Sequence, residues 1–194
     1  MMNDPVFSEV APELLTPHFR HLNEGSGISP SVIKGRGYRS LLGKSHLENL
    51  GFSSSQRHVP GILIPLWSVD GDGIVGYQFR PDSPRLNSKG RPIKYETPKG
   101  ATNRLDCPPV CRSNLSNPGI PLWITEGVKK ADALASLGEC VIDITGVWNW
   151  RAKNNFGGIT VSSDFDSIAL NDRQVYLAPD SDYATNPSVS QAFR

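Results

Sequence analysis

Residues 122–146 read LWITEGVKKADALASLGECVIDITG, with an apolar run on either side of a helical pattern. The run at 122–125 predicts a buried strand that ends at the turn Glu126-Gly127. Residues 128–137 predict a helix, for which Gly138 is the stop signal. The run at 141–144 predicts the next strand, which closes on Gly146. The helical period predicts four inward-facing side chains: Val128, Ala131, Ala135 and Leu137.

A third strand is predicted at residues 174–178, directly before Pro179 and Asp180. Between the second and third strands runs a polar segment, in which we expect Asp164 and Asp166 to lie in a surface loop. Strand, helix, strand, connection, strand is the order of a parallel α/β sheet. This half of the chain therefore predicts the α/β class.

The preceding part of the chain has a different period. Residues 62–67 (ILIPLW) and 74–79 (IVGYQF) flank the turn signal DGDG at 70–73, which predicts a β-hairpin. Pro65 predicts that the first strand is an edge or ends there. We expect a further short strand at 93–95, and a Pro- and Asn-rich link from 98 to 120.

The first 55 residues predict short helices and turns, with Ser29-Pro30 as the start of one helix. We therefore expect three parts with an α+β N-terminal half. They are a helical segment at 1–55, a basic mixed β-hairpin subdomain at 56–118 and an α/β domain at 119–194.

The formal net charge of the 194 residues is only +1, but the charges are unevenly distributed. Basic residues dominate the stretch from Arg80 to Arg104, and the last third is richer in carboxylates. This pattern suits a protein that binds phosphates beside a metal site, although a solvated face has the same composition. No signal pattern and no run of about 18 apolar residues occurs, so we expect a cytoplasmic protein with three reduced cysteines and no membrane partner.

Two of the predicted strands end in acidic residues. Glu126 follows the first, and Asp180-Ser181-Asp182 follows the third. Ligands of such sheets bind at the carboxyl ends of the strands, and carboxylate clusters suit Mg²⁺ or Mn²⁺. By itself, an Asp-x-Asp pair is more often a turn or a cap.

The order of several motifs along the chain indicates a family more specifically than the acidic residues alone. ITEG at 124–127, the Lys-, Ala- and Gly-bearing helix after it, Gly146 and the pair Asp180-x-Asp182 together resemble the Toprim motif series over about residues 120–194. Toprim domains occur in bacterial replicative primases, topoisomerases and some nucleases. The resemblance implies that Glu126 is a general acid/base or metal neighbour and that Asp180 and Asp182 bind Mg²⁺. Pro179 departs from the pattern, and the chain ends early, so we expect a Toprim-like, Rossmann-type parallel sheet that is incomplete at its C-terminus.

A second resemblance covers residues 64–98. The hairpin and the segment PIKYETP at 92–98 resemble the region before the Toprim unit in bacterial replicative primases. There the matching residues, here Arg80 and Lys94, face template or nucleotide phosphates. EGVKKA at 126–131 and GVWNW at 146–150 also resemble the Toprim-like domain at the front of phage and plasmid replication proteins.

The resulting hypothesis is a primase-like nucleotidyltransferase core of a phage- or plasmid-type replication protein, which makes primers on single-stranded DNA with Mg²⁺. Its expected partners are nucleoside triphosphates, DNA and a replicative helicase. Beside the three acids, the expected phosphate-binding residues are Arg80, Arg91, Lys94, Lys129 and Lys130. For the two lysines, a solvated helical face is the competing interpretation. Two alternative functions stay open: a Toprim nuclease and a non-catalytic DNA-binding module of a larger replication protein.

Overall fold

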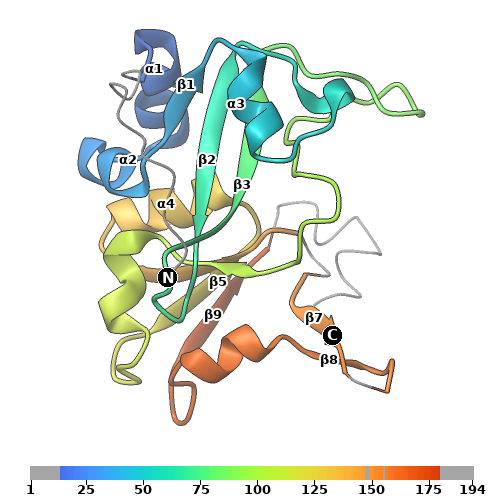
Figure 1. The fold of residues 1–194 in the computed structure, drawn as a ribbon. Helices are drawn as coiled ribbons and strands as arrows, with labels where there is room; N and C mark the ends of the chain where they lie inside the picture. Colours follow the sequence, from blue (N-terminus) through green and yellow to red (C-terminus); the bar gives the residue numbers. More distant parts are fainter. Residues whose placement is uncertain (1–13, 147–148, 155, 180–194) are drawn as a thin grey trace, which may run out of the picture.

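The computed structural model describes residues 14–146, 149–154 and 156–179. Asp180 and Asp182, with Trp148 of the GVWNW segment, lie outside these residues. Figure 1 shows an upper part built on a three-stranded sheet and a lower part built on a four-stranded sheet, with α4 between them. The chain is thus of the α/β class, with an α+β N-terminal half, as the sequence predicts.

From residue 14 on, where the description begins, the upper part contains three helices, one 3₁₀ turn and three strands. In chain order they are α1 (Thr16–Ser26), α2 (Pro30–Arg36), β1 (Arg39–Leu41), α3 (Lys44–Asn49), η1 (Ser54–Gln56), β2 (Gly61–Trp67) and β3 (Ile74–Pro81). Ser29 caps α2 by accepting a hydrogen bond from the Val32 amide, as its sequence predicts. The hairpin β2–β3 confirms the prediction at 62–79.

The lower part contains the parallel strands. Its elements are β4 (Leu105–Asp106), η2 (Pro109–Asn114), β5 (Leu122–Thr125), α4 (Val128–Ser136), β6 (Cys140–Ile144), β7 (Arg151–Lys153), β8 (Ile159–Val161), η3 (Ser163–Ser167) and β9 (Val175–Ala178). The sheet order is β4-β6-β5-β9, in which β5 pairs in parallel with both β6 and β9. The three strands predicted from the apolar runs are therefore confirmed.

Two elements lie across the expected domain boundaries. β1 pairs with β2, although it precedes residue 56. β4 pairs with β6, although it precedes residue 119. The division at 55 and 118 stays a proposal.

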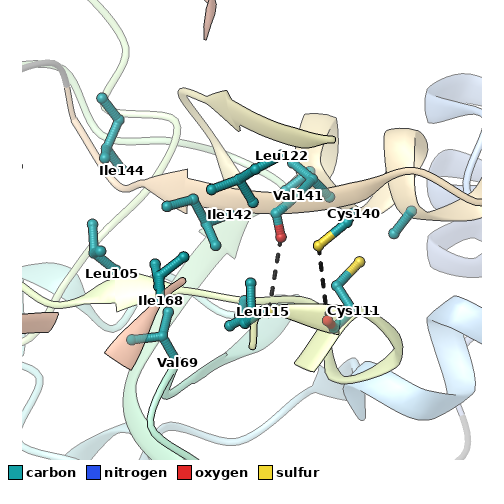
Figure 2. Close-up of a cluster of buried hydrophobic side chains, with 13 residues drawn as sticks. Val69, Leu105, Cys111, Leu115, Leu122, Cys140, Val141, Ile142, Ile144 and Ile168 are labelled. Carbon is teal, nitrogen blue, oxygen red and sulfur yellow. Dashed lines mark hydrogen bonds between the residues drawn. The ribbon is translucent and has the colours of Figure 1, made fainter. Parts of the chain in front are cut away.

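Apolar packing holds the lower sheet together. Figure 2 shows its core, in which Leu105, Leu122 and Ile142 from three strands pack with Leu115 and Ile168 from the flanking segments. All five side chains are buried. Among the described residues, no helix is long and apolar enough to cross a membrane.

α4 belongs to both cores. Ala131 and Ala135 pack on the lower sheet, whereas Val128 joins the cluster formed by α1, α2 and β2. Leu137, which we expected to face inward, is 79% exposed. It lies nine residues after Val128, and nine steps of 100° place it on the opposite side of the helix.

Three further expectations are wrong. The segment at 93–95 is not a strand, because only isolated bridges at Pro92 and Glu96 flank it. Pro65 lies in the middle strand of its sheet, and this is tolerated because β1 pairs only with residues 61–63. Asp164 is buried in η3, where it accepts hydrogen bonds from Arg104 Nε and the Leu105 amide.

Candidate functional site

A cavity of about 280 Å³ opens where β5 ends and α4 begins. Its wall combines both halves of the molecule: Gln78, Tyr95, Glu126, Gly127, Val128, Lys129, Lys130 and Thr145. A second hollow, of about 300 Å³, extends along β3 and the segment at 97–104. Gln78 and Thr145 line both, so the two hollows adjoin.

Glu126 lies at the carboxyl edge of the lower sheet. Thr125 pairs with Ala178 of β9, and its hydroxyl donates to the Ala178 carbonyl at 2.8 Å. Because β5 and β9 are parallel, the chain leaves the sheet at the same edge after each strand. Asp180 follows Pro179 in the sequence, but its position and that of Asp182 lie outside the described residues.

The described carboxylates alone do not form a metal site. In residues 14–146, 149–154 and 156–179, no group of three His, Cys, Asp or Glu side chains is placed to hold an ion. Asp143, at the end of β6, is fully buried, and one of its oxygens accepts the Gly127 amide. The wall of the cavity thus contributes one carboxylate, Glu126. An oxygen-ligated ion such as Mg²⁺ fits this edge only if the acids after Pro179 complete the ligand set.

The predicted phosphate-binding residues divide into two groups. Burial first, and the positive charges of Arg80 and Lys94 next, lower the pKa of Lys129. These three cations therefore lie close together although they come from β3, the following loop and α4. Lys130 lies in the cavity wall beside Lys129. Arg91 is in an exposed turn held by Asn87 and is not part of this wall.

Tyr95 connects the basic residues to the cavity. Burial raises the pKa of its phenol, and Arg80 opposes this by its charge and by a hydrogen bond. Tyr95, Gln78 and Thr145 line the cavity without having been predicted as site residues. Gln78 lies in β3, Tyr95 precedes the bridge from Glu96 to β3, and Thr145 directly follows β6. Their meeting at the cavity depends on tertiary packing.

A buried ionic network fixes α4 at this junction. Arg36, which is fully buried in α2, contacts Asp132 of α4 at 2.6 Å and Asp106 of β4 at 2.8 Å. Burial alone would lower the pKa of Arg36, but the two carboxylates outweigh it and raise the pKa well above its usual value. The Tyr38 hydroxyl donates to Asp132 as well. The network therefore fixes the middle of α4 relative to α2 and β4.

Comparison with known proteins agrees with this architecture. Residues 112–194 match the sequence model of a family described as a domain of unknown function, DUF3854. An uncharacterized protein of Picosynechococcus sp. is 27% identical over 217 aligned residues, which cover 85% of this chain and 22% of that protein.

Several solved primase structures are similar to this chain. The zinc-binding and RNA polymerase domains of the Aquifex aeolicus primase match with a TM-score of 0.59 at 13% identity, over 92% of this chain and 45% of that one. The RNA polymerase domain of Mycobacterium tuberculosis primase DnaG, in complex with double-stranded DNA, matches with a TM-score of 0.55 at 17% identity, over 90% and 60%. A DnaG primase catalytic domain bound to single-stranded DNA matches with a TM-score of 0.52 at 16% identity, over 86% and 56%.

These similarities establish the class of fold. The chain has the fold of a primase catalytic core, as the second sequence resemblance predicts. It spans about half the length of the primase structures and about a fifth of the Picosynechococcus protein. The cavity at the start of α4 is accordingly the candidate functional site of a primase-like fold.

Proposed function

We propose that this chain is the nucleotidyltransferase core of a phage- or plasmid-type replication protein that synthesises primers on single-stranded DNA. The observation that supports this most is the composition of one cavity. Glu126 and the two lysines of α4 line it together with Tyr95, and Arg80 and Lys94 lie next to Lys129. Phosphoryl transfer requires carboxylates that hold metal ions and, beside them, cations that neutralise the phosphate charge.

In this proposal, residues 119–194 form a Toprim-like domain whose acids are Glu126, Asp180 and Asp182. The first lies at the sheet edge, and the other two follow the strand that is paired with β5. Mg²⁺ or Mn²⁺ held by these acids would neutralise phosphate charge during the reaction. The Glu126 carboxylate would accept the proton of the attacking 3′ hydroxyl or share in holding the ion.

The basic residues would bind and orient the substrates. Lys129 and Arg80 would hold nucleotide phosphates at the cavity, and Lys94 with Lys130 would contact the template strand or the triphosphate. Such contacts weaken as salt rises, because each phosphate contact releases counterions. Arg91, on its separate turn, would contact DNA only outside the cavity.

The decisive experiment measures incorporation of labelled nucleotides on single-stranded DNA with Mg²⁺ or Mn²⁺. We expect short products from the wild type. Asp180→Asn with Asp182→Asn, and separately Glu126→Gln, should reduce synthesis at least 100-fold, in the range typical of lost metal or acid–base groups. Binding of single-stranded DNA should change less than about threefold. The matched control is Asp166→Asn, at an exposed acid of η3.

Three other outcomes would contradict the proposal. Cleavage of DNA without added nucleotides, lost in the same variants, would indicate a Toprim nuclease. Metal-independent DNA binding without turnover would indicate a binding module of a larger replication protein. Equal loss of synthesis and DNA binding in the Asp variants would indicate that the carboxylates are structural.

A further inference from the structure

His21 and Lys129 face each other across the junction of α1 and α4. The Lys129 ammonium lies 3.1 Å from His21 Nε2 and donates to the Ser26 hydroxyl, also at 3.1 Å. A lysine ammonium has only donors, so His21 Nε2 must accept this hydrogen bond. The imidazole is therefore neutral in this arrangement, with its proton on Nδ1.

The charged groups around His21 oppose its protonation. Partial burial first, and then the charges of Lys129, Arg80 and His18 in that order, lower the pKa of His21 to about 4. Asp82 acts in the opposite direction. Its carboxylate, however, lies 3.1 Å from His18 Nε2, so it is shared with another imidazole.

Three cations lie together next to this junction: Arg80, Lys94 and Lys129. The ion pairs found among residues 14–146, 149–154 and 156–179 do not include Arg80, Lys94 or Lys129. Burial lowers the pKa of Lys129 most, and the like charges of Arg80 and Lys94 lower it further. The same cations adjoin the cavity at the first turn of α4, and that turn contains no acidic residue. An anion is the partner that would relieve this repulsion.

We propose that binding of a nucleotide triphosphate at the cations Arg80, Lys94 and Lys129 is coupled to uptake of a proton by His21. Arg80 and Lys94 lie close enough to Lys129 for their charges to act on it, and such a compact group suits the dense charge of a polyphosphate. A phosphate oxygen would take the donors that Lys129 now directs at the imidazole. His21 would then bind a proton from solvent and become a further donor to the phosphate.

The coupling has a definite thermodynamic consequence. Free His21 is unprotonated at pH 6 because its pKa is about 4. If the bound anion holds it protonated, up to one proton enters per site, and affinity rises up to about tenfold for each pH unit of acidification near pH 6. This inference rests on the proposed function for the identity of the ligand.

The test is calorimetric titration of the full chain with inorganic tripolyphosphate, without metal, at pH 6 in two buffers of different ionisation enthalpy. Tripolyphosphate titrates in this pH range as well, so the contribution of His21 is the difference in proton uptake between wild type and His21→Gln. We expect the wild type to take up between half a proton and one proton more than His21→Gln, which should fold normally by circular dichroism and show a weaker pH dependence of affinity. The control is His58→Gln, at an exposed histidine outside this cluster, which should behave as wild type.

A second measurement is independent of the variants. An NMR titration of the imidazole signals should show the pKa of His21 rising by at least two units when tripolyphosphate is present. Equal proton uptake by wild type and His21→Gln, or no binding, would overturn the inference. Proton uptake with a short oligonucleotide that lacks a triphosphate, but not with tripolyphosphate, would overturn the choice of ligand. None of these readouts requires primer synthesis. Primer synthesis without this coupling would refute only this inference. Coupling without primer synthesis would refute only the proposed function.

Discussion

The carboxylate of Asp143 accepts a hydrogen bond from the backbone amide of Gly127, the residue that follows Glu126. Asp143 is the last residue but one of β6 and is fully buried, so the turn at Gly127 is held from inside the sheet. Asp106 is its partner across the β4–β6 pairing. Within the described residues, the second carboxylate oxygen of each has no hydrogen-bond partner. Two such oxygens side by side are most stable when one carboxyl keeps its proton.

Asp143→Asn should therefore be tolerated, whereas Asp143→Ala should not. The amide oxygen of Asn still accepts the Gly127 N–H, and its NH₂ group can donate to Asp106. Ala leaves buried polar groups unpaired, which should cost about 1–3 kcal/mol of unfolding free energy in urea titrations. Primer synthesis should fall with Ala and not with Asn. Equal destabilisation by both substitutions would show that Asp143 is ionised in the folded chain.

The pH dependence of stability should differ between wild type and Asp143→Asn. Burial first, and Asp106 next, raise the pKa of Asp143 well above its ordinary value of 3.8. The folded chain therefore keeps a proton that the unfolded chain has released, and stability from this group falls as pH rises from about 4 to the folded pKa. The slope of the wild type relative to the variant should approach about −1.4 kcal/mol per pH unit in this window. Urea unfolding of both proteins at several pH values measures it, and parallel curves would contradict it.

The strands and α4 were predictable because their apolar runs end at turn residues, as at Gly127 and Gly138. The buried polar contacts that hold these elements together could not be predicted from the sequence. Asp143 lies inside the run VIDI, where its burial leaves no mark in the local pattern. Arg36 meets Asp106 and Asp132 across 70 and 96 positions, and such long-range pairs have no signature in one sequence. The predicted acids Asp180 and Asp182 remain predictions.

Replacing Arg36 should be among the most damaging changes in the chain. Arg36→Met would leave Asp106 and Asp132 buried without their counter-charge, which should cost about 3–5 kcal/mol or prevent folding. Arg20→Met, at an exposed position of α1, should change stability by less than about 0.5 kcal/mol. Thermal and urea unfolding would compare them. Near-wild-type stability of Arg36→Met would show that the carboxylates take up protons at little cost.

Gly61→Ala should separate β2 from β3. A Cβ at this position would lie 2.5 Å from the Arg80 carbonyl oxygen and 2.6 Å from the Phe79 ring, closer than van der Waals contact allows. The strands must shift to relieve this overlap, so we expect a loss of about 1–3 kcal/mol. Because Arg80 is displaced with the strand, binding of tripolyphosphate should weaken more than global stability alone explains.

The matched control for this change is Gly35→Ala. Gly35 lies in α2, and an added Cβ there meets no atom within 4 Å. Alanine favours the helix and reduces the freedom of the unfolded chain, so this variant should gain about 0.5–1 kcal/mol. The two alanine substitutions therefore have opposite expected signs in urea unfolding. If Gly61→Ala is as stable as wild type, the close approach of β2 to Arg80 does not exist in solution, and the position assigned to Arg80 beside Lys129 fails with it.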